Sequence, residues 1–131
     1  NVYFWLLHYL SVGTWGTGPF DNHAARDVLD SLRDGSFDLR HFQRSCGTGV
    51  LDSDEAEAVI ALGALTKLPA DGLPDGVAPR DLTSLYTPQS KAWLRRRINQ
   101  AMCSESSSVY ALWEPTGELN QWLHTAQAAL P

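Results

Sequence analysis

His23 and Asp27 come nearest, by type and spacing, to a catalytic or metal-binding pair in this chain. Residues four apart lie on one face of a helix, so the imidazole and the carboxylate could form a general base or begin a metal site. Asp30 and Asp34 continue the acidic strip, but no second histidine follows at ligand spacing. We therefore interpret the strip as a solvated helix face and predict no catalytic residue and no metal ligand in it.

A glycine-rich stretch at residues 13–22 is the second candidate site. A glycine loop before a helix can bind phosphate, because backbone N–H groups and the helix dipole face the anion. Here no strand pattern precedes the loop, the lysine of a P-loop is absent, and Asp21 would place a negative charge where phosphate should lie. We interpret the motif as structural, with glycines that let its two aromatic side chains fold back and become buried. Its residues are Gly13, Trp15, Gly16, Gly18, Pro19, Phe20 and Asn22.

The only basic run of the chain is Arg95, Arg96 and Arg97. Such a run could bind a phosphate or an acidic partner, because guanidinium groups suit both. An isolated run is a weak signal, and acids outnumber bases in this chain. We expect the arginines to pair with the chain's own carboxylates, such as Asp27, Asp30 and Asp34.

Hydroxyls, thiols and the remaining histidines also lack a catalytic context. The serines at 104–108 have no nucleophile-elbow motif, and His41 and His124 have no partner nearby in sequence. Cys46 and Cys103 form no clustered metal-binding pattern, and a disulfide between them stays open beside the simpler interpretation of two cytoplasmic thiols. We expect Cys103 to be a buried structural thiol, and we predict no cofactor.

Length and composition describe a single globular domain. The chain has 131 residues, of which 44% are hydrophobic and 19% are charged. The net charge of −5 disfavours nucleic acid and anionic membranes as partners, since both attract basic surfaces. Another protein is therefore the partner that we expect.

The apolar segment at residues 1–10 has two interpretations. It is too short to span a bilayer and lacks the basic region and cleavage site of a signal peptide. It is either a terminal element packed on the domain or an extension upstream of a true start at Val12. We divide the chain into an N-terminal extension, residues 1–12, and one helical domain, residues 13–131, and predict that residues 1–11 are dispensable for folding.

Helical patterns dominate from Asp21 onward, and no alternating strand pattern is convincing. Asp21 or Asn22 can cap a first helix that ends at Gly35, and Thr87 can cap another. The helix that starts at Ser53 is apolar almost all round at 56–65, which predicts a central, buried helix. Further helices are expected at 37–44, 80–86, 88–102, 104–113 (capped by Ser104) and 119–130. The fold class is therefore all-α, a compact bundle of about five to seven helices.

The motif at residues 13–20 resembles the opening of a bacterial family, domain of unknown function 4259. A second signature of that family is matched by Leu112, Trp113 and Glu114 and by Trp122 and Leu123. The resemblance covers nearly the whole chain after residue 12. It implies a short bacterial protein that starts at position 12, and no activity or catalytic residue comes with it.

The leading functional hypothesis is a small cytoplasmic protein that binds another protein and has no catalytic activity, with immunity-type proteins as one such class. The alternative is a small enzyme with a site near the glycine and tryptophan motif and His23. A convergent polar pocket that holds His23 with Asp27 would favour the enzyme. A broad exposed apolar or acidic patch would favour the binding protein.

Overall fold

The computed structural model describes residues 16–131, and the predictions for Val12, Gly13, Trp15 and the apolar N-terminal segment lie outside this range. Within it the chain is helical, which confirms the all-α prediction. None of these helices is long and apolar enough to cross a lipid bilayer. The α-helices are α2 (His23–Asp34), α3 (Leu39–Cys46), α4 (Ser53–Lys67), α5 (Pro88–Ala101), α6 (Ser108–Trp113) and α7 (Leu119–Ala128), and the 3-10 helices are η1 (Ala70–Gly72), η2 (Pro79–Leu85) and η3 (Glu114–Thr116).

Short polar side chains set the starts of the long helices. The side-chain oxygen of Asn22 accepts a hydrogen bond of 2.7 Å from the N–H of Ala25, and Thr87 caps α5 in the same way. Asp52 caps α4 directly before Ser53. Gly35 ends α2 with a φ of 78°, a left-handed conformation that glycine adopts without strain.

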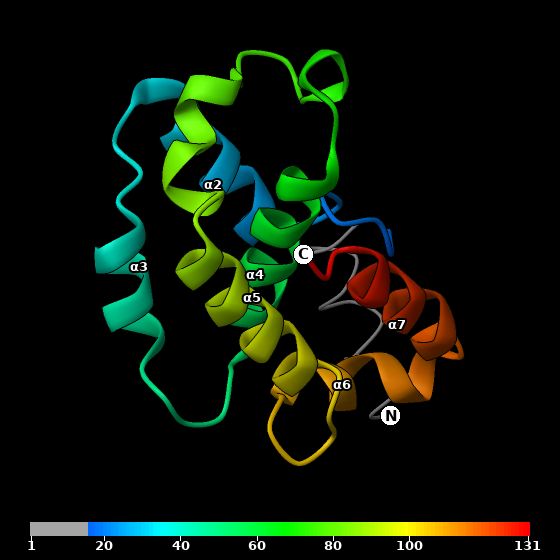
Figure 1. The fold of residues 1–131 in the computed structure, drawn as a ribbon. Coiled ribbons are helices and arrows are strands. Elements are labelled where there is room, and N and C mark those ends of the chain that lie inside the picture. The colour runs from blue at the N-terminus through cyan, green and yellow to red at the C-terminus, as the bar shows by residue number, and fades with distance from the viewer. Residues whose placement is uncertain (1–15) are drawn as a thin grey trace.

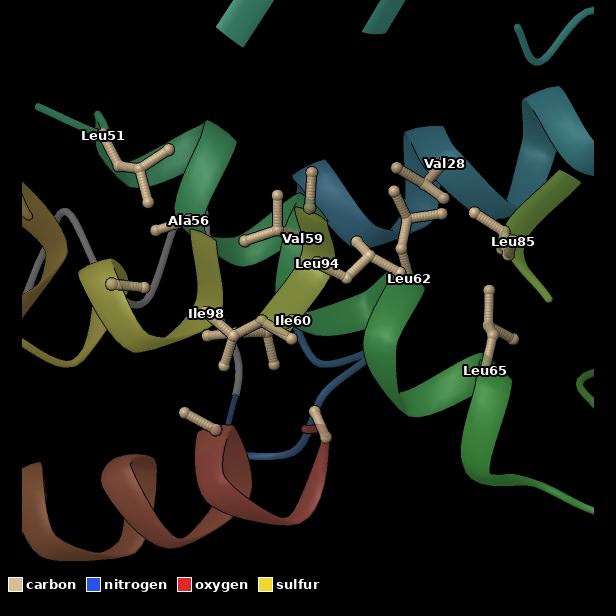
Figure 2. Close-up of a cluster of buried hydrophobic side chains, with 14 of the residues drawn as sticks. Val28, Leu51, Ala56, Val59, Ile60, Leu62, Leu65, Leu85, Leu94 and Ile98 are labelled. Carbon is tan, nitrogen blue, oxygen red and sulfur yellow. The ribbon is translucent and has the colours of Figure 1, made fainter. Parts of the chain in front are cut away.

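The central element is α4, as its all-round apolar sequence predicted. Its residues from Ala56 to Gly63, and Leu65, are buried. The core around it contains Leu62 of α4, Leu94 and Ile98 of α5 and Val28 of α2 (Figure 2). The helices α3 and α7 lie on opposite sides of the α4–α5 pair (Figure 1). The neighbours of α4 thus bury its whole circumference in one hydrophobic core.

Gly63 allows a close approach between α4 and the end of α7. A Cβ atom at this position would lie 2.5 Å from both the Ala129 carbonyl oxygen and the Ile98 Cδ1. The end of α7 therefore packs directly against the backbone of α4.

The brief helix expected at 80–86 is present as the 3-10 helix η2 (Pro79–Leu85). One helix prediction is wrong: Ser104 caps no helix, because α6 begins only at Ser108. The reason for the late start is a bridge between Leu51 and Ser107. The N–H of Leu51 donates to the Ser106 carbonyl, and the N–H of Ser108 donates to the Leu51 carbonyl, each at 3.0 Å. This pairing holds Ser107 in an extended conformation, and residues 102–106 before it form turns.

The arginine run does not pair with the chain's acids, contrary to expectation. Arg95 donates to the carbonyl of Pro131 at 3.0 and 3.1 Å. Arg97 is 4% exposed and donates to the carbonyls of Cys46 and Gly49, both at 3.3 Å. The buried guanidinium thus satisfies carbonyl groups at the C-terminal end of α3, where the helix dipole favours a cation.

The cysteines are unpaired, and Cys103 is exposed where a buried thiol was expected. It follows Met102, which ends α5, so its side chain leaves the buried stripe of that helix. Cys46, by contrast, is buried at the end of α3.

Candidate functional site

The glycine motif folds around the carboxylate of Asp21. The Asp21 Oδ2 accepts a hydrogen bond of 3.0 Å from the N–H of Gly18. A Cβ atom at either Gly16 or Gly18 would lie 2.6 Å from this oxygen. The glycines therefore leave room for the carboxylate over the loop. Phe20 packs against the core but is half-buried, which is less than predicted.

The glycine motif also lies next to Trp113 and Trp122 of the second family signature. A space of about 10 Å³ lies between residues 16–19, the buried side chain of Glu57 on α4, and the indoles of Trp113 and Trp122. Room for about one water molecule excludes a nucleotide or metabolite. The motif residues that the structure describes thus join the two ends of the helical chain.

We predict that Gly18→Ala lowers the free energy of unfolding by about 1 kcal/mol, because the new methyl group displaces the Asp21 carboxylate and its hydrogen bond. In an Asp21→Ala background the same change should have little effect. Urea unfolding of the two single variants and the double variant measures the coupling. Strictly additive effects would contradict this account of the loop.

A groove with a volume of about 420 Å³ lies between α2, α3 and the start of α4. Apolar groups from all three helices and from the loop before α3 form part of it. Phe37 of this loop and Phe42 of α3 have ring centroids 6.1 Å apart. We call it the α2–α3 groove. Its residues are His23, Ala24, Asp27, Val28, Ser31, Ser36, Phe37, Asp38, His41, Phe42, Ser45, Asp54, Glu55 and Ala58.

The groove brings His41 to His23 and Asp27, although His41 lies on another segment of the sequence. His23 and Asp27 share one face of α2, and His41 faces the same space from α3. His41 was not predicted to belong to a site with His23, although Asp38, His41 and Ser45 share one helix face at spacings of three and four residues. The side chains of His23, Asp27 and His41 are all exposed. Residues 16–131 contain no group of three or more His, Cys, Asp or Glu side chains able to hold a metal ion.

Two contacts position α3 as the outer wall of the groove. The Phe42 ring lies edge-on against Trp93 of α5, with centroids 6.0 Å apart. Arg97 of α5 bonds the carbonyl of Cys46 at the other end of the helix. The helix α5 therefore supports the groove from behind without lining it.

Acidic side chains of α4 meet the buried thiol of α3 beside the groove. Burial raises the pKa of the Cys46 thiol to about 11, with a further rise from the Glu55 carboxylate and an opposing effect of Arg97. The thiol is therefore protonated at neutral pH and a poor nucleophile. Burial also raises the pKa of Glu55, and the neighbouring Asp52 carboxylate adds to this rise.

We predict that Glu55→Gln stabilises the protein at neutral pH and not in acid. The folded protein binds the Glu55 proton more tightly than the unfolded chain does, so ionisation destabilises the fold as the pH rises. Below about pH 4, where both states are protonated, the advantage of glutamine should vanish. Thermal unfolding between pH 3.5 and 8 measures it, with exposed Asp54→Asn as the control that gains nothing. An unchanged difference across this range would contradict the prediction.

Comparison with known protein families matches residues 13–125 to the family described as Domain of unknown function (DUF4259). The match begins at Gly13, the first glycine of the motif, and extends into α7. Comparisons with curated proteins and with solved structures gave no significant match. The match spans most of the chain and bears out the resemblance seen in its opening motif, so the chain belongs to the DUF4259 family.

Proposed function

We propose that this protein binds another protein through the α2–α3 groove and is not itself a catalyst. The observation that carries the proposal is the character of the groove, which is open and exposed, with aromatic rings inside and carboxylates around them. Aromatic side chains surrounded by polar groups are typical of protein interfaces. A regulatory or immunity-type protein is the class that this surface suits best.

The alternative, an enzyme that uses His23 and Asp27, has one observation in its favour, since both residues line the groove. Catalysis by such a pair depends on a site that excludes water and on a perturbed acid or base. Both side chains are instead exposed to solvent. We therefore favour binding over catalysis.

A reducing compartment fits the proposal. Cys46 and Cys103 are both unpaired, and Cys103 is exposed. Exposed free thiols are common in the cytoplasm and rare in oxidising compartments. We place the protein in the bacterial cytoplasm on this ground together with its family resemblance.

The test is affinity purification of tagged protein from its cells of origin, comparing two double variants with the unmodified chain. Asp27→Lys/Ser45→Arg reverses a charge and fills the groove at two exposed positions. Asp71→Lys/Ser104→Arg makes the same changes at exposed positions outside the groove. We expect a protein that is recovered with the unmodified chain and with the control, is lost with the groove variant, and binds the purified chain directly.

Recovery of the same proteins with both variants would overturn the proposal. So would turnover of a small substrate that His23→Ala or Asp27→Asn abolishes while the fold stays intact. That second result would establish the enzyme instead.

A further inference from the structure

We propose that the α2–α3 groove binds an arginine-bearing segment of the partner protein, with the guanidinium stacked on the groove aromatics and paired with its carboxylates. This inference rests on the proposed function and specifies the chemistry of the partner. It follows from the separation of charges on the helices, from the aromatic rings and from an unsatisfied carboxylate.

The groove is lined by carboxylates, whereas the arginines of α2 and α3 lie outside it. Four carboxylates line the groove, and none of the fourteen described lining residues is lysine or arginine. The basic residues of the two helices do not line it, and they are Arg26, Arg33, Arg40 and Arg44. Arg33, for example, donates instead to the Asp75 carbonyl and pairs with Asp30. Carboxylates of α2, α4 and the start of α3 would therefore attract a cation that enters the groove, and no arginine of the groove lining competes with it for them.

The aromatic rings favour arginine over lysine. Phe37 and Phe42 line the groove and are both half-buried, so part of each ring is open to a ligand. A planar guanidinium stacks on aromatic rings and forms paired hydrogen bonds with a carboxylate, whereas an ammonium group provides only a compact point charge. The combination of rings and carboxylates thus matches a guanidinium.

The third observation is the unsatisfied carboxylate oxygen of Glu55. Its Oε2 is buried and has no hydrogen-bond partner within residues 16–131. Burial raises the pKa of Glu55, and repulsion from the Asp52 carboxylate raises it further, while the positive charge of Arg97 acts in the opposite direction. Arg97 therefore compensates the acidity beside the groove only in part. A guanidinium would provide both the missing donors and the opposite charge.

The shape of the groove suits a peptide segment better than a free amino acid. Its volume of about 420 Å³ lies within the range of ligand sites, and it is open to solvent along one side. Apolar groups of Val28 and Ala58 line it beside the rings. A segment with aliphatic residues next to its arginine would cover these groups as well.

The experiment is a ¹⁵N–¹H NMR titration with three synthetic peptides that differ at two positions. The probe is acetyl-Ala-Leu-Arg-Ala-Leu-Arg-Ala-amide, and its analogues carry citrulline or glutamate in place of both arginines. Citrulline keeps the shape of arginine and removes the charge. We expect the arginine peptide to shift amide signals of α2, α3 and the start of α4, with affinity that falls as salt rises.

Matched variants locate the charge effect. Asp27→Asn/Asp54→Asn neutralises two exposed carboxylates of the groove, and Asp71→Asn/Asp75→Asn neutralises two exposed carboxylates outside it. The groove variant should bind the arginine peptide at least about tenfold more weakly, and the control should bind it as the unmodified chain does. Circular dichroism confirms that both are folded.

Three results would overturn the inference. They are equal binding of the arginine and citrulline peptides, no binding of the arginine peptide, and binding of free arginine amide as tight as that of the peptide. A partner captured through the groove that nevertheless binds the neutralised variant equally well would also overturn it, while leaving the proposed function intact. If the unmodified chain neither captures a partner through the groove nor binds the arginine peptide, the proposed function and this inference are both rejected.

Discussion

Replacement of Trp113 by alanine should lower the free energy of unfolding by about 3–5 kcal/mol, the range for removing a large buried aromatic side chain. Trp113 is 2% exposed and packs where the glycine motif, α4 and α7 meet. Its loss would leave a cavity at the junction of the two family signatures. The indole N–H has no hydrogen-bond partner within residues 16–131, so the expected loss comes from packing.

Chemical unfolding of Trp113→Ala and Trp113→Phe provides the measurement. Phenylalanine keeps most of the apolar volume and removes only an unpaired N–H group, so it should be the milder change. Equal losses in the two variants would show that the ring volume is not what stabilises this junction. A Trp113→Ala variant as stable as the unmodified chain would contradict the buried packing itself.

Gly63→Leu should be the second large change, with a loss of about 3 kcal/mol from overpacking. Leucine favours a helix more than glycine does by close to 1 kcal/mol, which opposes the loss only in part. The new side chain must displace the Ala129 backbone and the Ile98 side chain, each 2.5 Å from its first atom. Separation of the end of α7 from α4 is the expected structural result.

Gly49→Leu is the matched control, because nothing lies within 4 Å of a Cβ atom there. Thermal unfolding of both variants should show a large loss for Gly63 and a small change for Gly49. Comparable losses would mean that glycine is needed at Gly63 for some reason other than the close approach of α7.

Local signals in the sequence predicted the helices well. Asn22, Gly35 and Thr87 act within one turn of their own positions, so a cap or a left-handed glycine is visible without knowledge of the fold. The burial of α4 was equally readable, because its apolar residues leave no polar face. The start of α6 was not, since the pairing of Leu51 with Ser107 joins segments far apart in the chain.

The candidate site was only half predictable for the same reason. The sequence placed His23 and Asp27 on one face of α2, but their approach to His41 depends on how α3 packs. In the sequence Arg97 resembled a surface charge in an exposed run. Only the fold shows that its guanidinium is buried next to the carbonyl groups that accept its hydrogen bonds. The glycines at positions 16 and 18 are likewise needed because the Asp21 carboxylate occupies the space of a side chain there, and not because the backbone adopts a conformation that only glycine allows.

The attachment of α3 has a consequence for the motions of the molecule. Only Leu39 and Cys46 of this helix are buried, and its carbonyl contact with Arg97 lies at its final turn. Short, sparsely buried segments open locally at far lower free energy than the core. In hydrogen–deuterium exchange, the amides of α3 should therefore exchange long before those of α4, and an occupied groove should slow them. The helix α3, which forms the outer wall of the groove, would then also be the part of the fold that can change its conformation to fit a ligand.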